Sequence, residues 1–326
     1  MPTTSSPFPD RQTLARGLNA VFNDNGSARG PLTILRREPT LYATSFPCEI
    51  VRGRFEDGSR LALFCKYTQG NGDGVCSHGQ RGGVVYEIAV YRQVLQPSRV
   101  STPTFYGAYT DPSTSSTWLI LEYLERSMAV GKVGKLAVMK QAVRWIAQFH
   151  SFYEARLSSV SIPVLTSYDA AYYRGWARRT ARFAGHWHRR FPWLAALCRR
   201  LQKALAFLAA RPRTVIHGEY YPHNILFQRG LVRPVDWETA AIGAGQIDLA
   251  TITEGWSPEI IKQFELEYQQ ARWPDGPPAD FQRALDLARV YVQVRWLGDE
   301  PEATTRKDML PYFTQLRLLS ERLELI

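Results

Sequence analysis

The sequence lacks the features that mark several classes of protein. It has only four cysteines in 326 residues, and none of them forms a CxxC pair or another metal-ligand spacing. It contains no apolar run near the roughly 18–20 residues that a membrane span needs. Its start has no basic segment followed by an apolar one, which a signal peptide would require. We therefore expect a cytoplasmic protein with reduced thiols and no membrane contact, and we interpret residues 1–12 as a disordered tail.

Charge is present in quantity but is unevenly distributed, with a formal net charge of +10. Residues 174–203 hold nine Lys or Arg and no acid, whereas residues 254–302 hold ten acids and five bases. Such asymmetry can indicate a surface for nucleic acid or for an acidic ligand. No zinc-finger, RRM or helix-turn-helix signature accompanies it. We therefore interpret the basic range as a solvated helical face and do not expect nucleic-acid binding.

The most informative stretch is 215–238, which has the pattern of a short apolar strand, a polar loop, and two short strands joined at Arg229-Gly230. If these two residues form a hairpin turn, counting outward along both strands places Asn224 and Asp236 at the same open end. Glu219 precedes them on the loop that leads into the hairpin. The sequence therefore predicts that an amide and two carboxylates lie close together.

Amide and carboxylate oxygens are hard ligands that suit a magnesium ion holding phosphates. In phosphoryl transfer one acid orients the attacking hydroxyl, and an Asn and an Asp hold the metal on the β- and γ-phosphates. The pattern favours Glu219 for the first role and Asn224 and Asp236 for the second. Glu238 could hold the metal through water or form a structural ion pair. The alternative is a hairpin whose polar residues only satisfy backbone groups.

Two segments carry a family resemblance: His-Gly-Glu-Tyr-Tyr-Pro-His-Asn-Ile-Leu at 217–226 and Pro-Val-Asp-Trp-Glu at 234–238. They resemble the catalytic signature of the aminoglycoside phosphotransferase and choline kinase-like families, including its Ile-Asp-Trp-like strand. Residues 246–250 resemble the Asp-Leu-Ala segment of those families, and the resemblance implies that Asp248 fixes the catalytic loop. It also implies ATP or GTP and Mg²⁺ as cofactors, and a hydroxylated small molecule as the acceptor.

The resemblance further implies a bilobal, protein-kinase-like α+β fold. Its β-rich nucleotide-binding lobe would span residues 13–121, and its mainly helical catalytic and substrate lobe residues 122–326. Strands are expected at 32–36, 41–45, 49–55, 61–67 and 117–124, with an Asp57-Gly58 turn. Helices are expected at 14–22, 84–95, 135–153, within 168–210, and at 258–270, 281–296 and 309–325.

Four residues of the first lobe take their roles from the resemblance. Lys66 would hold the α- and β-phosphates and Glu87 would pair with it. Glu122 and Tyr123 would lie in the hinge, where backbone groups bind the adenine ring. On the residues alone, a lysine such as Lys66 is usually an edge residue with its ammonium group in water, and Glu87 could be a surface acid. The strand that ends at Glu122 could likewise be a plain core strand.

The chain departs from the family pattern at Glu219, which stands where the family has Asp. The extra methylene moves the carboxylate by roughly 1 Å. Because positioning dominates phosphoryl transfer, a Glu can still orient a hydroxyl if the loop makes room. The alternative is a nucleotide-binding pseudokinase or scaffold with weakened catalysis. His150 and His217 are interpreted as packed, supporting histidines.

Overall fold

The computed structural model describes residues 6–24, 26, 28–40, 46–68, 82–187, 189–299 and 310–326. The chain forms two compact units, which are Met1–Met128 with Leu226–Glu238 and Ala129–Ile225 with Thr239–Ile326. The division falls after Met128, and the first unit also takes in a hairpin from later in the sequence. Helices and antiparallel sheet occur together, which confirms the predicted α+β class.

The first unit contains a five-stranded antiparallel sheet in the order β1-β2-β3-β5-β4. Its elements are α1 (Arg11–Asp24), β1 (Leu32–Pro39), β2 (Cys48–Phe55), β3 (Arg60–Tyr67), α2 (Gly83–Val90), the π-helix η2 (Tyr91–Leu95), α3 (Gln96–Ser98), β4 (Phe105–Thr110) and β5 (Thr117–Glu122). The expected helices at 14–22 and 84–95 and the expected strands at 32–36, 49–55, 61–67 and 117–124 are confirmed. The expected strand at 41–45 lies outside the described residues.

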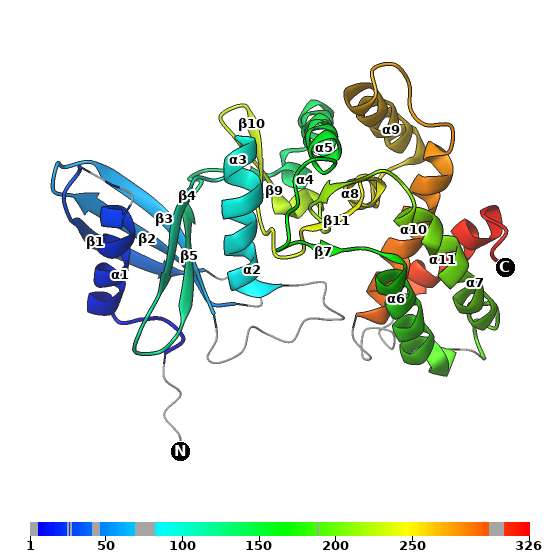
Figure 1. Ribbon diagram of the computed structural model, residues 1–326, viewed down its shortest axis with the longest axis horizontal. Coiled ribbons are helices and arrows are strands. Elements are labelled where there is room, and N and C mark those ends of the chain that lie inside the picture. Colours follow the sequence, from blue (N-terminus) through cyan, green and yellow to red (C-terminus); the bar gives the residue numbers. More distant parts are fainter. Residues whose placement is uncertain are drawn as a thin grey trace. The chain divides into compact units, whose positions relative to one another are not determined.

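The core of this unit lies between α1 and the sheet (Figure 1). Leu14, Leu18 and Phe22 repeat along one face of α1 and are buried against strand residues such as Leu63 and Trp118. Each such side chain contributes about 1.5–3 kcal/mol on burial. This packing fixes the sheet that carries the lysine of the candidate site.

The hairpin of the first unit joins β9 (Ile225–Gln228) to β10 (Leu231–Pro234). Arg229 has φ of 50° and Gly230 has φ of 83°, so both turn residues adopt left-handed conformations. That combination is typical of the type I′ turn, whose twist matches that of the two strands. The predicted two-residue turn is confirmed.

The second unit is mainly helical. Its elements are α4 (Val130–Val133), α5 (Leu136–Arg156), β7 (Thr166–Ser167), α6 (Ala170–Phe183), η3 (Ala184–Trp187), α7 (Trp193–Ala209), β8 (Arg213–Ile216), η4 (Pro222–Asn224), β11 (Ala241–Ala244), α8 (Gln246–Ile252), α9 (Pro258–Arg272), α10 (Phe281–Gly298) and α11 (Leu310–Arg322); β6 (Met128–Ala129) lies at the boundary. The helices expected at 135–153, within 168–210, at 258–270, 281–296 and 309–325 are confirmed. None of the helices in the described ranges is both long and apolar enough to cross a membrane.

A small sheet and one buried helix organise the second unit. Strand β8 pairs antiparallel with β11, and Ile216 lies opposite Ala241. The chain then leaves β8 at Ile216 and enters the loop that begins at His217. Helix α10 contacts α6, α7, α8 and α11 (Figure 1). Most of its residues are buried. Helix α10 therefore lies in the interior of the second unit and packs against helices from four parts of its sequence.

Candidate active site

In the first unit a buried lysine is surrounded by three carboxylates. The Nζ atom of Lys66 lies 2.9 Å from Glu87 Oε2, 3.0 Å from Asp236 Oδ1 and 3.3 Å from Glu238 Oε2. Strand β3 provides Lys66, helix α2 provides Glu87, and the segment after β10 provides the other two. The structure therefore contains the Lys66–Glu87 contact, and Lys66 is 5% exposed rather than at a solvated edge.

The cluster carries more negative than positive charge. Burial acts to lower the pKa of Lys66, but Glu87, Asp236 and Glu238 outweigh it and raise that pKa well above its ordinary value. Burial raises the pKa of the Glu238 carboxyl to about 7, against the opposing effect of Lys66. The Asp236 side chain is 41% exposed, whereas those of Glu87 and Glu238 are buried. A divalent cation beside Asp236 would therefore reduce the excess of negative charge.

Asp236 has an unusual backbone conformation. Its φ is +64°, and strand β10 already ends at Pro234. The prediction of an Ile-Asp-Trp-like strand across residues 234–238 is therefore wrong, because a residue in the left-handed conformation interrupts the extended backbone. Asp and Asn tolerate this conformation better than most residues do. Asp236 and Glu238 contact the same Lys66, but strand alternation is not the reason.

The residues expected in the hinge already have partners within the first unit. The backbone N–H of Glu122 donates to Thr104 O at 2.8 Å, and that of Tyr123 donates to Ala62 O at 3.0 Å. The Glu122 carboxylate pairs with Arg233 at 2.9 Å. An adenine contact through these two N–H groups would have to displace the present bonds, so their hinge role stays a prediction.

In the second unit the loop after β8 is held by a buried aspartate. Asp248 on α8 accepts hydrogen bonds from the backbone N–H groups of His217, at 2.7 Å, and Gly218, at 2.9 Å. Gly218 has φ of +85°, and a Cβ atom there would lie 2.4 Å from Thr239 O. Only glycine fits this position. These contacts agree with the loop-fixing role expected for Asp248.

The loop also positions the side chain of Asn224. Its Nδ2 donates to Glu219 O at 3.0 Å. This bond uses the amide nitrogen, so the amide oxygen is the side-chain atom suited to a cation. His217 is fully buried, and its Nδ1 accepts from the backbone N–H of Glu219 at 3.3 Å, which agrees with a supporting histidine.

The residue that the sequence did not indicate is Arg295 on α10. Its Nη1 lies 2.8 Å from Glu219 Oε1, and its Nη2 donates to the Tyr221 hydroxyl at 2.6 Å. Burial acts to lower the pKa of Arg295, but Tyr221 and Glu219 outweigh it and raise that pKa well above its ordinary value. Arg295 is one of several bases in an acidic stretch, and nothing in its spacing separates it from the others.

His150 is a packed histidine, as expected. It is fully buried in α5, with Nε2 3.0 Å from Asp248 Oδ2 and Nδ1 2.8 Å from the Tyr268 hydroxyl. Burial lowers the pKa of His150 below its ordinary value of 6.5, and it outweighs the hydrogen bond to Asp248, which acts to raise that pKa.

This burial predicts a pH dependence of stability. As the pH falls below 6.5, the unfolded chain takes up a proton at residue 150 before the folded chain does, so stability that is present above that pH is lost. The loss is at most about 1.4 kcal/mol per pH unit from this one group. We expect His150→Gln to have a shallower fall between pH 7.5 and pH 5.5 than wild type, measured by urea unfolding. An unchanged slope in the variant would contradict the prediction.

The arginine-rich stretch is partly occupied by structural contacts. Arg179 donates to Gly298 O at 3.0 Å and to Asp299 O at 2.9 Å, at the end of α10. Its guanidinium carbon lies 4.8 Å from the centre of the Phe183 ring. At Arg179 the basic range therefore fixes one helix against another, and the residue is not a free charge for a ligand.

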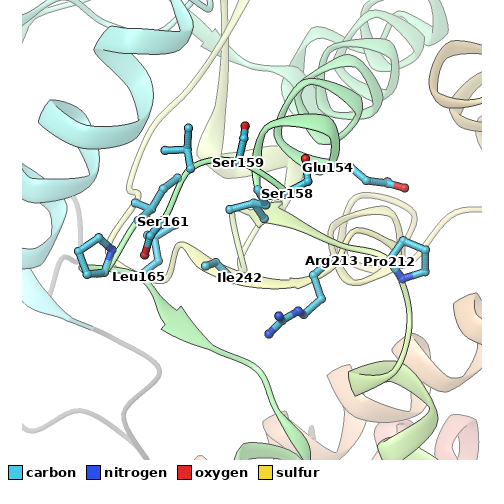
Figure 2. A pocket seen from close by; sticks show the side chains of 12 residues that line it. Glu154, Ser158, Ser159, Ser161, Leu165, Pro212, Arg213 and Ile242 are labelled. Atoms are coloured by element: carbon cyan, nitrogen blue, oxygen red, sulfur yellow. The ribbon is translucent and has the colours of Figure 1, made fainter.

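A cavity of about 770 Å³ opens in the second unit (Figure 2). Its lining includes Ser158 and Ser159 after α5, Arg213 at the start of β8, and Ile242 in β11. No predicted site residue lines it, and its Arg213 is bonded to Ser167 at 3.3 Å. The cavity is therefore separate from the loop at 217–224.

Comparison with solved structures shows the same fold over nearly the whole chain. The choline kinase LicA from Streptococcus pneumoniae has a TM-score of 0.58 at 12% identity, covering 94% of this chain and 98% of its own. A GDP complex of wild-type aminoglycoside 2′-phosphotransferase-IIIa has a TM-score of 0.58 at 13% identity, covering 97% and 100%. A putative fructosamine-3-kinase from Haemophilus somnus has a TM-score of 0.59 at 12% identity, covering 94% and 97%. The predicted kinase-like fold is confirmed.

Two sequence comparisons were informative about the family of the chain. The search of curated proteins gave no match. The model of the phosphotransferase enzyme family matches residues 83–282, which is more than half of the chain. The predicted relationship is thereby confirmed, and the chain belongs to the phosphotransferase enzyme family.

Proposed function

We propose that this chain is a small-molecule kinase that transfers the γ-phosphoryl group of ATP or GTP to a hydroxyl group. The observation that carries the proposal is the buried Lys66–Glu87 ion pair beside the carboxylate of Asp236. In kinase-like enzymes such a pair positions the lysine on the phosphates, and the aspartate binds the metal. Similar structures described as complexes with GDP and with AMP support a nucleotide as the donor.

In the proposed reaction the acceptor oxygen forms a bond to the γ-phosphorus as the bond from that phosphorus to the β–γ bridging oxygen breaks. The nucleoside diphosphate leaves with the electron pair, and the hydroxyl proton passes to the Glu219 carboxylate. Lys66 holds the α- and β-phosphates, and Glu87 keeps its ammonium group in place. Magnesium, when bound, would neutralise charge on the β- and γ-phosphates, with the oxygens of Asn224 and Asp236 as its protein ligands.

The donor set fits magnesium in its chemistry. Magnesium in nucleotide sites keeps several waters and is bound by one or two carboxylates together with phosphates. Among the described residues no three His, Cys, Asp or Glu side chains are placed to hold a metal by themselves. A metal at Asp236 would therefore depend on nucleotide and water oxygens for its remaining ligands.

The proposal is tested by direct turnover. Purified protein is incubated with Mg²⁺ and with ATP or GTP against a panel of hydroxylated metabolites, and phosphorylated acceptor and nucleoside diphosphate are both quantified. We expect at least one acceptor to yield the two products in equal amounts. No phosphorylated product from any acceptor would refute the proposal.

Replacing Glu219 by glutamine should lower kcat by about 100-fold, because the amide cannot accept the hydroxyl proton. The donor Kd should change little, because Glu219 is assigned to the acceptor rather than to the nucleotide. Steady-state kinetics and nucleotide titration check the two expectations. Glu259→Gln is the matched control, since Glu259 is an exposed acid at the start of α9. Equal losses in both variants would contradict the role of Glu219.

One observation favours a second function. The Glu219 carboxylate is paired with a buried arginine, which occupies an oxygen that an acceptor hydroxyl would otherwise contact. The chain would then be a nucleotide-binding pseudokinase or scaffold. Nucleotide binding without turnover on any acceptor would favour this alternative over the kinase.

A further inference from the structure

Arg295 is a buried cation, only 3% exposed, in the last turn of α10. Removing a guanidinium from water is costly unless partners replace the lost hydration. Its hydrogen bonds to Glu219 and Tyr221 both reach the loop that follows β8. The guanidinium also lies 5.8 Å from the Tyr221 ring centre and 5.3 Å from that of Trp296. The guanidinium of Arg295 therefore interacts mainly with this loop.

The length of the side chain at position 219 determines this contact. Glu219 Oε1 is 2.8 Å from Arg295 Nη1. An aspartate on the same backbone would withdraw its carboxylate by roughly 1 Å, to a separation beyond hydrogen-bond range. The glutamate that departs from the family pattern is thus the residue that can reach the arginine.

We propose that Arg295 is a positioning residue for Glu219: it holds the longer side chain in the one orientation that receives the acceptor hydroxyl. This inference rests on the proposed function. A glutamate has more rotamers than an aspartate, and a fixed guanidinium on a buried helix removes most of that freedom. Because phosphoryl transfer depends mainly on positioning, the anchored carboxylate can orient a hydroxyl despite its extra methylene.

The proposal predicts that loss of Arg295 lowers kcat and leaves the acceptor KM nearly unchanged. Arg295 is buried and engaged with the loop, so it does not itself bind the acceptor. Arg295→Met keeps the apolar stem and removes the charge. We expect kcat to fall by about 100-fold, the cost of a misplacement near 1 Å. The acceptor KM and the donor Kd should each change by less than about threefold, within what loss of positioning alone would give.

A double-mutant cycle tests whether Arg295 acts through Glu219. Glu219→Asp breaks the same contact from the other side, so it should also lower kcat, by about 10–100-fold. The combined variant should then be within about threefold of Glu219→Asp alone, because the second change removes nothing further. Arg295→Lys should have a kcat between those of Arg295→Met and wild type, since an ammonium group keeps the charge but cannot bind Glu219 and Tyr221 with two separate nitrogens.

The control is Arg289→Met on the same helix. Arg289 pairs with Glu265 at 2.7 Å and Asp286 at 3.1 Å, and neither residue belongs to the loop. This variant should keep the wild-type kcat. If Arg295→Met fails to fold, Tyr221→Phe and Arg295→Lys decide, because Tyr221→Phe removes one hydrogen-bond partner of the guanidinium and Arg295→Lys keeps a cation in its site.

The outcomes are distinct. Non-additive losses with an unchanged acceptor KM support the inference. Losses that multiply across the cycle, or wild-type kcat in both Tyr221→Phe and Arg295→Lys, overturn it while leaving the kinase intact. A wild-type protein without turnover on any acceptor refutes the proposed function and this inference together.

Discussion

Replacing Asp236 by alanine should reduce phosphoryl transfer by about 10³-fold or more. A metal ion contributes several kcal/mol of charge stabilisation in such reactions, and each 1.36 kcal/mol is a factor of ten in rate. Asp236 is the carboxylate of the Lys66 cluster that is 41% exposed, so it is the one most open to a cation. The loss should be measured as kcat with saturating acceptor over a range of Mg²⁺ concentrations.

The change should leave the fold in place. Lys66 keeps Glu87 and Glu238 as partners when the Asp236 carboxylate is removed. The left-handed backbone at Asp236 adds a small cost for alanine, which Asp236→Asn avoids, because asparagine tolerates that conformation. The asparagine variant should therefore lose the activity with less change in the unfolding temperature.

The control is Asp24→Ala, at the exposed end of α1 in the same unit. It should turn over at the wild-type rate. Nearly normal turnover in both Asp236 variants would show that the reaction does not use this carboxylate. Normal turnover in the asparagine variant alone would show that backbone strain caused the loss in the alanine variant.

The elements that the sequence predicted correctly are those with a strong period. Leu14, Leu18, Val21 and Phe22 recur at helical spacing because one face of α1 is buried. Strand β4 was missed because all of its residues but the last are half-buried, so no alternation appears, and Gly107 interrupts it. Strand β11 has only four residues, and three of them are Ala or Gly, so Ile242 is its one β-branched residue. Neither strand therefore has the alternation of apolar and polar residues, or the run of β-branched residues, from which a strand is predicted.

The candidate site divides in the same way. Lys66, Glu87 and Asp248 took their roles from the family resemblance, and the structure shows the Lys66–Glu87 contact and the hydrogen bonds from the loop to Asp248. Whether Asn224 and Asp236 share one metal stays a prediction. Arg295 could not be found, because it meets Glu219 across 76 residues of sequence. A contact between a loop and a distant helix depends on tertiary packing, which neither helical period nor local charge records.

Replacing Asp248 by alanine should cause the largest loss of stability among these substitutions. Its carboxylate is fully buried and accepts from two backbone N–H groups, those of His217 and Gly218, as well as contacting His150. Each buried donor left without an acceptor costs about 1–3 kcal/mol, so the total should reach roughly 3–5 kcal/mol. Chemical denaturation at pH 7.5 measures this loss as a change in the free energy of unfolding.

The same substitution should lower kcat, because the backbone that leads to Glu219 loses the two hydrogen bonds that Asp248 accepts from it. Asp248→Asn should lie between wild type and alanine, since its one carbonyl oxygen can accept from only part of this set. Asp275→Ala, an exposed acid just after α9, is the matched control and should change neither quantity. Wild-type stability in Asp248→Ala would mean that the loop finds other acceptors, and the role of Asp248 as its anchor would have to be withdrawn.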